Sequence, residues 1–198
     1  MSSKLNTANL SRIRFLDGKR LFLTPLAECD LDSTYRWFHD KEFVDLVGSY
    51  LQPTSMAKYR DGFDKLLMSC DGKTRVFLSI ILKSSGAFIG NVSLDGIDQY
   101  EHKASFGLFI GEPKYRRKGF GSEAARLLLR FAFEDMGLRR IEATSHGLNK
   151  GTPSLNEKLG FVKEGIARQQ YFYGGRYVDS IKYGMLRQDY KRSAKIAR

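Results

Sequence analysis

Residues 111–121 read Gly-Glu-Pro-Lys-Tyr-Arg-Arg-Lys-Gly-Phe-Gly, a basic loop with two glycines near its end. Alternating apolar residues predict a strand over residues 104–110, and apolar residues at helical spacing predict a helix over residues 122–136. Glycines let a backbone approach a ligand, and the start of a helix offers unpaired N–H groups that attract an anion. The loop therefore predicts a cradle for a pyrophosphate. The alternative is a basic glycine turn that only caps the helix.

Strand and helix patterns alternate on both sides of this loop. Before it, the sequence predicts a strand at 20–24, helices at 30–38 and after Pro53, strands at 76–82 and 87–94, and a polar loop at 95–101. After it, a strand at 140–145 and a short helix ending at Leu159 precede one or two further strands. The hairpin-like succession predicts an α+β (mixed α/β) fold with an antiparallel half-sheet.

The chain has 198 residues, of which 42% are hydrophobic, and a net charge of +11. This length suits a single domain over residues 13–190, with a flexible arm at 1–12 and a basic tail at 191–198. Most of the excess charge lies in two segments, because residues 114–140 carry +5 and residues 187–198 carry +4. A uniformly basic coat for nucleic acid is therefore not indicated.

The sequence has no apolar run long enough to span a bilayer, and its polar start lacks the pattern of a signal peptide. Its two cysteines are far apart and suggest no metal-ligand cluster. We therefore expect a cytoplasmic protein that uses no metal and does not associate with membranes.

A second motif begins at Asn149 and ends in Glu157-Lys-Leu-Gly-Phe161, with Asn149 twelve residues before Phe161. Together with the Arg116-x-x-Gly-x-Gly121 loop, it resembles the acyl-CoA-binding core of the GNAT superfamily of N-acetyltransferases. The C-terminal stretch after Glu164 and the segment Trp37-Phe-His-Asp40 look like the ribosomal-protein-alanine (RimJ/RimL-type) branch and its polyamine-acetylating relatives.

The resemblance implies the acyl-CoA N-acyltransferase fold, with a central, mostly antiparallel mixed sheet of about seven strands flanked by helices. A splayed strand pair is expected at the cofactor site. The implied activity is direct transfer of acetyl from acetyl-CoA to a primary amine, either a protein N-terminal α-amine, such as that of a ribosomal protein, or a polyamine or other small amine. A homodimer is common among such relatives.

The resemblance also assigns residues to acetyl-CoA. The strand, the loop and the helix start are expected to line the pantetheine and the pyrophosphate, and the second motif is expected to contribute one polar contact. For the side chains of Arg116 and Lys118, solvated surface charge is an equal alternative. The cofactor-binding set is Leu108, Phe109, Ile110, Arg116, Arg117, Lys118, Gly119, Phe120, Gly121, Ser122 and Asn149.

The catalytic residues depart from the family's usual pattern. Ser105 occupies the position where many members carry a glutamate base, and Asn156 occupies that of a tyrosine acid. Glu101 and His102, just upstream, are either substitutes for the base that act through water or solvated loop residues, with Asp95 and Glu142 as further candidates. Asn156 can donate a hydrogen bond but is no acid at neutral pH. Thr152 either assists the thiolate or caps the helix that follows it.

Two alternatives to an active enzyme stay open. The missing glutamate and tyrosine allow a catalytically silent acyl-CoA-binding protein, and the net charge allows a basic nucleic-acid-binding module. The sequence does not identify the amine acceptor. Asp40, Glu42 and Asp45 either begin an acidic pocket for polyamines or are exposed charges at the end of a helix.

Overall fold

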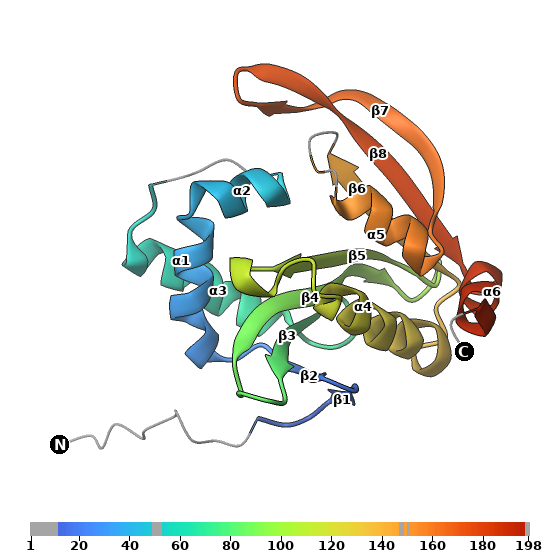
Figure 1. Cartoon of the computed structure of the whole chain (residues 1–198), viewed down its shortest axis with the longest axis horizontal. Helices are drawn as coiled ribbons and strands as arrows, with labels where there is room; N and C mark the ends of the chain where they lie inside the picture. Colours follow the sequence, from blue (N-terminus) through green and yellow to red (C-terminus); the bar gives the residue numbers. More distant parts are fainter. Residues whose placement is uncertain (1–11, 49–52, 147–148, 150, 197–198) are drawn as a thin grey trace.

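A computed structural model describes residues 12–48, 53–146, 149 and 151–196 of the chain. Its eight strands form one sheet with the order β1-β2-β3-β4-β5-β6-β8-β7 (Figure 1). All neighbouring strands are antiparallel except β5 and β6, which are parallel. The strands are β1 (Leu16–Asp17), β2 (Leu21–Pro25), β3 (Val76–Leu82), β4 (Phe88–Asp98), β5 (Lys103–Ile110), β6 (Arg140–His146), β7 (Val162–Tyr173) and β8 (Arg176–Leu186). The mostly antiparallel mixed sheet is thus confirmed, with the two-residue β1 as an addition.

In the described part of the chain, six α-helices lie around this sheet (Figure 1). The main core lies between α4 and one sheet face, to which β5 contributes the four alternating apolar residues 104, 106, 108 and 110. On the other face, Phe63 of α3 packs near Phe77, and Trp37 of α1 packs near Phe109. The helices are α1 (Leu31–Phe38), α2 (Lys41–Val47), α3 (Met56–Ser69), α4 (Phe120–Arg130), α5 (Gly151–Leu159) and α6 (Arg187–Ile196).

Several element boundaries differ from the expectation. β4 continues to Asp98, so part of the expected polar loop at 95–101 is strand. α2 was not predicted, although its start has a clear cap in Asp40, whose carboxylate accepts a hydrogen bond from the N–H of Phe43 at 2.8 Å. α6 runs through the expected boundary between the domain and the basic tail at 190/191. The expected arm at 1–12 lies outside the described residues except for Arg12. In the described part of the chain, no helix is long and apolar enough to cross a membrane.

The parallel strands β5 and β6 pair over only three positions, residues 103–105 with residues 140–142. Beyond them, β5 stays bonded to β4 as far as Ile110, and β6 stays bonded to β8 as far as His146. The two strands therefore separate while each keeps its outer neighbour. This is the expected splayed pair, and it opens a gap in the sheet next to the basic loop.

Gly111, at the end of β5, packs directly against the indole of Trp37. A Cβ atom at Gly111 would lie 2.0 Å from the ring carbon Cδ2 of Trp37, whose side chain is 4% exposed. Replacing Gly111 by alanine should therefore lower the free energy of unfolding by about 1–3 kcal/mol, the usual cost of overpacking. Urea unfolding followed by circular dichroism measures this change.

The matched control is Gly62→Ala in α3, where a Cβ would meet no atom within 4 Å. Because alanine is the better helix former, this variant should gain up to about 1 kcal/mol. A Gly111→Ala variant as stable as the wild type would contradict the close packing of Gly111 on Trp37.

Candidate functional site

The basic loop is shaped by two residues in the left-handed backbone region. After a single 3₁₀ turn, η3 (Pro113–Tyr115), Arg117 has φ 57° and Gly119 has φ 81°. Gly119 is the N-cap of α4, and its carbonyl accepts a hydrogen bond from the N–H of Glu123 at 3.1 Å. Within the described residues, the N–H groups of Phe120, Gly121 and Ser122 have no acceptor. The helix therefore presents three unpaired donors and the positive end of its dipole, as an anion site requires.

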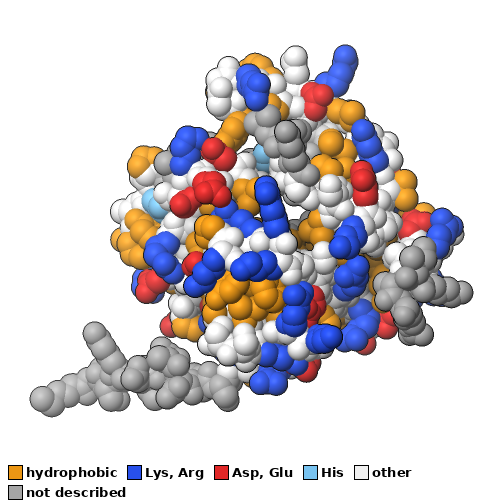
Figure 2. All heavy atoms as spheres, in the orientation of Figure 1, with side chains coloured by type: hydrophobic (Ala, Val, Ile, Leu, Met, Phe, Trp, Pro, Cys, Tyr) orange, Lys and Arg blue, Asp and Glu red, His pale blue; other side chains and the backbone are white. Residues whose placement is uncertain are grey.

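Cationic side chains surround this helix start. Figure 2 shows Lys and Arg side chains gathered on the face that carries α4. Of the basic residues in the loop, Lys114, Arg117 and Lys118 are exposed to solvent. These three are free to attract an anion, whereas Arg116 is engaged elsewhere.

The side chain of Arg116 fixes the loop by hydrogen bonds to the end of β5 and to α2. Its Nε donates to the carbonyl of Ile110 at 3.1 Å, and its Nη2 donates to the carbonyl of Gly111 at 2.8 Å. Its Nη1 pairs with Glu42 of α2 at 2.7 Å, and the arginine side chain is only 15% exposed. The structure thus gives the side chain of Arg116 a role in fixing the end of β5 to the loop and to α2.

Arg20 holds the other end of the loop and was not predicted from the sequence. Its guanidinium donates to the carbonyl of Lys118 at 3.0 Å, pairs with Glu123 at 2.8 Å and lies over the ring of Phe120 at 4.5 Å. Burial favours the neutral form of Glu123, but hydrogen bonds from the main chain and the guanidinium of Arg20 outweigh it and lower the pKa of Glu123. The one acid in the first turn of α4 is therefore neutralised by Arg20.

The strand residues expected to line the cofactor lie along the gap. Leu108 and Ile110 face α4, and a Cβ atom at Gly121 would lie 3.3 Å from Cδ2 of Leu108. Phe109 faces the opposite side and packs edge-on against Phe43 at 5.3 Å between ring centroids. Alternate residues of a strand direct their N–H and C=O groups to opposite sides, so half of these main-chain groups face the gap.

Asn149 caps α5 and ties it to α2. Its Oδ1 accepts hydrogen bonds from the N–H groups of Gly151 at 2.9 Å and Thr152 at 3.0 Å, while its Nδ2 donates to the carbonyl of Leu46 at 2.7 Å. The capping role considered for Thr152 therefore belongs to Asn149. Thr152 itself lies half-buried in the first turn of α5.

Asn156 is a buried donor without a partner. Its side chain is 1% exposed, and its Nδ2 has no hydrogen-bond acceptor among the described residues. It lies on the inner face of α5, as does Leu159, which belongs to the core on the α4 side of the sheet. A buried donor left unpaired costs about 1–3 kcal/mol, so this amide is available for a ligand at little further cost.

Glu101 lies far from the gap. It stands in the exposed turn before β5, with its carboxylate 3.8 Å from Arg139. Glu101 precedes the start of β5, and the extended chain from Lys103 to Leu108 alone spans about 17 Å. The structure therefore does not bring Glu101 to the gap, which weakens its assignment as the base.

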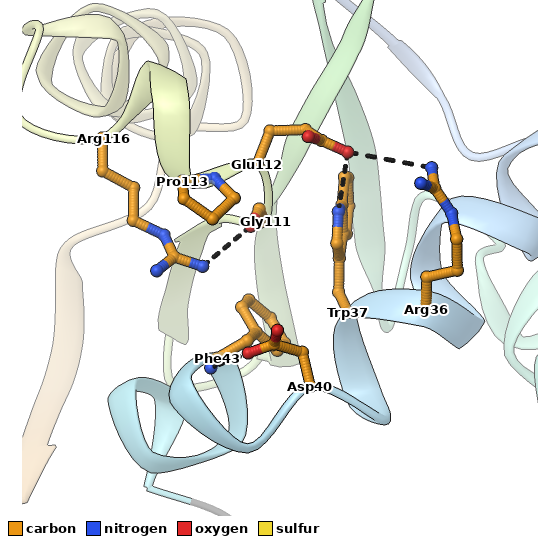
Figure 3. Close-up of a pocket in the computed structure, with 8 residues that line it drawn as sticks. All are labelled: Arg36, Trp37, Asp40, Phe43, Gly111, Glu112, Pro113 and Arg116. Carbon is orange, nitrogen blue, oxygen red and sulfur yellow. Dashed lines mark hydrogen bonds and ion pairs between the residues drawn. The ribbon is translucent and has the colours of Figure 1, made fainter.

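A cavity of about 180 Å³ lies between α1, α2 and the start of the loop (Figure 3). Glu112 accepts a hydrogen bond from Nε1 of Trp37 at 3.2 Å and lies 3.7 Å from Arg36. The acids considered for a polyamine pocket are engaged, because Asp40 caps α2, Glu42 pairs with Arg116 and Asp45 pairs with Lys41 at 2.9 Å. The cavity is lined by Arg36, Trp37, Asp40, Phe43, Gly111, Glu112, Pro113 and Arg116.

The end of β6 and the end of β7 meet near α2. His146, which is 8% exposed, stacks on Tyr173 with ring centroids 6.2 Å apart. The neighbouring Tyr173 hydroxyl and Lys41 hold the pKa of Asp45 below its usual value, and burial together with Asp45 raises the pKa of Tyr173. Tyr173 thus places the end of the β7–β8 hairpin beside His146 and near Asp45 of α2, although its hydroxyl makes no hydrogen bond among the described residues. In the described residues, no group of three or more His, Cys, Asp or Glu side chains is placed to hold a metal ion.

Comparisons with known proteins agree with this arrangement. Residues 20–162 match the acetyltransferase (GNAT) domain family. The chain is 33% identical to the prophage-derived N-acetyltransferase YokL of Bacillus subtilis, over 77% of this chain and 82% of that protein. It is 30% identical to the N-acetyltransferase p20 of Bacillus licheniformis, over 87% of this chain and 96% of that protein.

Among solved structures, spermidine N-acetyltransferase from Vibrio cholerae, in complex with CoA and spermine, has the same fold. The TM-score is 0.78 at 22% identity, covering 87% of this chain and 98% of that one. The chain therefore belongs to the GNAT acetyltransferases, and it is an N-acetyltransferase whose acetyl donor is acetyl-CoA.

Proposed function

We propose that the chain transfers acetyl from acetyl-CoA directly to a primary amine, either the N-terminal α-amine of a protein or a polyamine. The observation that carries the proposal is the junction of two features. The unpaired N–H groups of the first turn of α4 lie directly after the splayed end of β5. The unpaired N–H groups suit the pyrophosphate of acetyl-CoA, and the splayed end of β5 suits its extended arm.

The pyrophosphate binds to main-chain N–H groups between Arg117 and Ser122. The left-handed conformation of Gly119 supports this assignment, because no side chain at the N-cap competes for those donors. The exposed Lys118 and Arg117 add attraction without being fixed in place. Asn149, whose side chain caps α5, acts by holding that helix at the gap.

The thioester lies in the gap beside Phe109. The main chain of residues 108–110 lines the gap, and a backbone N–H there, near Phe109, is the donor for the developing oxyanion. Thr152 and Asn156 lie four residues apart in α5 and so share one face of the helix. Asn156 stabilises the leaving thiolate by a hydrogen bond, and Thr152 supplies the hydroxyl that Asn156 lacks.

The partners follow from the same assignment. We infer a cytoplasmic enzyme with an amine acceptor, and the family resemblance offers a homodimer as the assembly to test. Size-exclusion chromatography with light scattering tests the dimer: a mass near 45 kDa supports it and a mass near 22.6 kDa contradicts it.

An amine panel tests the proposed reaction. With acetyl-CoA present, spermidine, putrescine, lysine and peptides with a free N-terminal alanine or serine should differ in their rate of thiol release. At least one should give a rate well above the rate without amine. If acetyl-CoA raises the melting temperature but no amine releases thiol, the protein is a silent acyl-CoA binder. If acetyl-CoA gives no thermal shift, the site itself is misplaced.

Ser122→Glu separates cofactor binding from stability. Glutamate is favourable near the start of a helix, so the melting temperature should stay equal or rise. The new carboxylate would meet the pyrophosphate with like charge, so the Kd for acetyl-CoA, measured by calorimetry, should rise at least tenfold. Ser122→Ala is the control and should bind within threefold of the wild type. Unchanged affinity of Ser122→Glu would refute the placement of the pyrophosphate.

Asn156→Leu tests the buried amide. Leucine removes an unpaired buried donor, so the free energy of unfolding should rise by about 1–3 kcal/mol. Loss of a donor to the reacting centre should lower kcat by about 10²-fold or more while acetyl-CoA still raises the melting temperature. Lys158→Ala, at an exposed position of the same helix, is the control. A stabilised Asn156→Leu variant with normal kcat would show that Asn156 has no part in the reaction.

A further inference from the structure

An amine that is protonated at neutral pH must lose a proton before its nitrogen can attack a thioester. We propose that Glu142 of β6 takes this proton. The proposal rests on the acetyl transfer proposed above and names a residue for it.

The register places Glu142 at the apex of the gap. Glu142 is opposite Ser105 in the last of the three pairs that join β5 and β6. Beyond this pair the strands separate, so Glu142 is the last β6 side chain before the gap opens. Paired neighbours on adjacent strands share a face of the sheet.

That face is the one away from α4. The preceding residues on both strands, Ala104 and Ile141, are buried in the core against α4, at 2% and 0% exposure. Because side chains alternate along a strand, Ser105 and Glu142 point to the opposite side. Ser105 is exposed, and the side chain of Glu142 is 46% exposed, so an amine can reach this carboxylate from solvent.

Asp95 is the rival carboxylate, because it is opposite Ser105 on the other neighbour, β4. Both of its oxygens are occupied. Oδ1 accepts from Nε of Arg75 at 2.6 Å, and Oδ2 accepts from the hydroxyl of Ser93 at 2.8 Å. Asp95 also lies on the side of β5 away from the gap. It is therefore the less suited of the two acids.

Glu142 keeps one oxygen free. Its Oε1 accepts from Nε of Arg140 at 3.0 Å, and its Oε2 has no partner among the described residues. The rest of that guanidinium is bound to Glu164, with Nη1 2.7 Å from Oε1. The hydrogen bond with Glu164 is the main reason that the pKa of Arg140 is raised and the first reason that the pKa of Glu164 is lowered. Arg140 is thus committed chiefly to Glu164, and it steadies Glu142 by a single hydrogen bond.

The groups that act on the amine and on the thiolate then lie on opposite faces of the sheet. The amine approaches from the face that carries Glu142. Asn156 lies on the α4 side, where its amide donates a hydrogen bond to the sulfur. The charged groups on the face of Glu142 are those of its own strand and of the strands beside it. They are Arg140, Glu164, Lys103, Lys182, Asp95 and Asp98.

The protons and bonds balance as follows. One N–H proton of the ammonium passes to Oε2 of Glu142, directly or through one water. The freed lone pair forms the C–N bond to the acetyl carbon, and the C–S bond breaks. A second proton leaves the nitrogen as the amide forms, one proton returns to the sulfur, and one is released to solvent.

Glu142→Gln tests this role, measured with the best amine of the panel. At pH 7, kcat/KM should fall about 10²-fold, the usual contribution of a general base. The deficit should shrink as the pH rises toward the pKa of a primary amine, about 10, where the substrate deprotonates itself. The thermal shift caused by acetyl-CoA should be unchanged, and Glu142→Asp should recover part of the rate.

Glu164→Gln is the matched control, because it disturbs the same Arg140 from the far side. It should keep kcat/KM within about threefold of the wild type. An equal loss in both variants would reduce Glu142 to a structural part of the Arg140 cluster. Wild-type rates of Glu142→Gln across the pH range would overturn the proposal. If the wild type itself releases no thiol with any amine, acetyl transfer fails first, which is a distinct result.

Discussion

The pairing between β5 and β6 stops after three residues, and everything in the candidate site depends on that early separation. Neither strand is loose, because β5 remains bonded to β4 and β6 remains bonded to β8 on their outer sides. The inner edges lose their partners, and unpaired backbone groups away from water are costly. An extended ligand that carries its own amides can restore those bonds. The sheet is thus prepared for an arm of that kind before any side chain is considered.

The gap needs a rigid border, and the loop after β5 supplies it. Arg116 binds the last carbonyls of the strand and Glu42 of α2, while Arg20 binds the loop at Lys118 and α4 at Glu123. Between these two braces, Arg117 adopts a positive φ of 57°, which costs a non-glycine residue about 1 kcal/mol or more. A conformation of this cost persists only because its surroundings enforce it. The braces therefore explain how the N–H groups of α4 keep their direction.

Local patterns made much of this arrangement predictable. The alternation over residues 104–110 correctly predicted a strand with one apolar face, which packs against α4, and Ser55 caps the helix expected after Pro53. Side-chain contacts between residues far apart in the sequence were not predictable. For Arg116 the sequence left a phosphate contact and solvated surface charge as alternatives, because its partner Glu42 is 74 residues away. The partnership of Arg20 with Glu123 spans 103 residues.

Distance along the sequence and distance in the sheet differ for the candidate bases. Glu101 is four residues from Ser105 and lies in the turn before β5, whereas Glu142 is adjacent to Ser105 only through the register of β5 and β6. The short α2 was missed for a related reason. Seven residues contain too few turns for a helical period to stand out, and α2 forms because Phe43 and Val44 pack on the aromatic cluster around Trp37.

The positive net charge of the chain acquires a more specific meaning from these contacts. Arg116 and Arg20 are paired with acids, so the charges left to attract a polyanion are the exposed Lys114, Arg117 and Lys118 beside α4. Glu142 lies on the opposite face of the sheet, where a cationic amine is the ligand to attract. Salt screens charges beyond about 8 Å at physiological ionic strength, and packed layers are about 10 Å apart. The exposed cations of the loop and the proposed amine site at Glu142 therefore lie on different faces of the sheet, so the loop cations repel the amine only weakly.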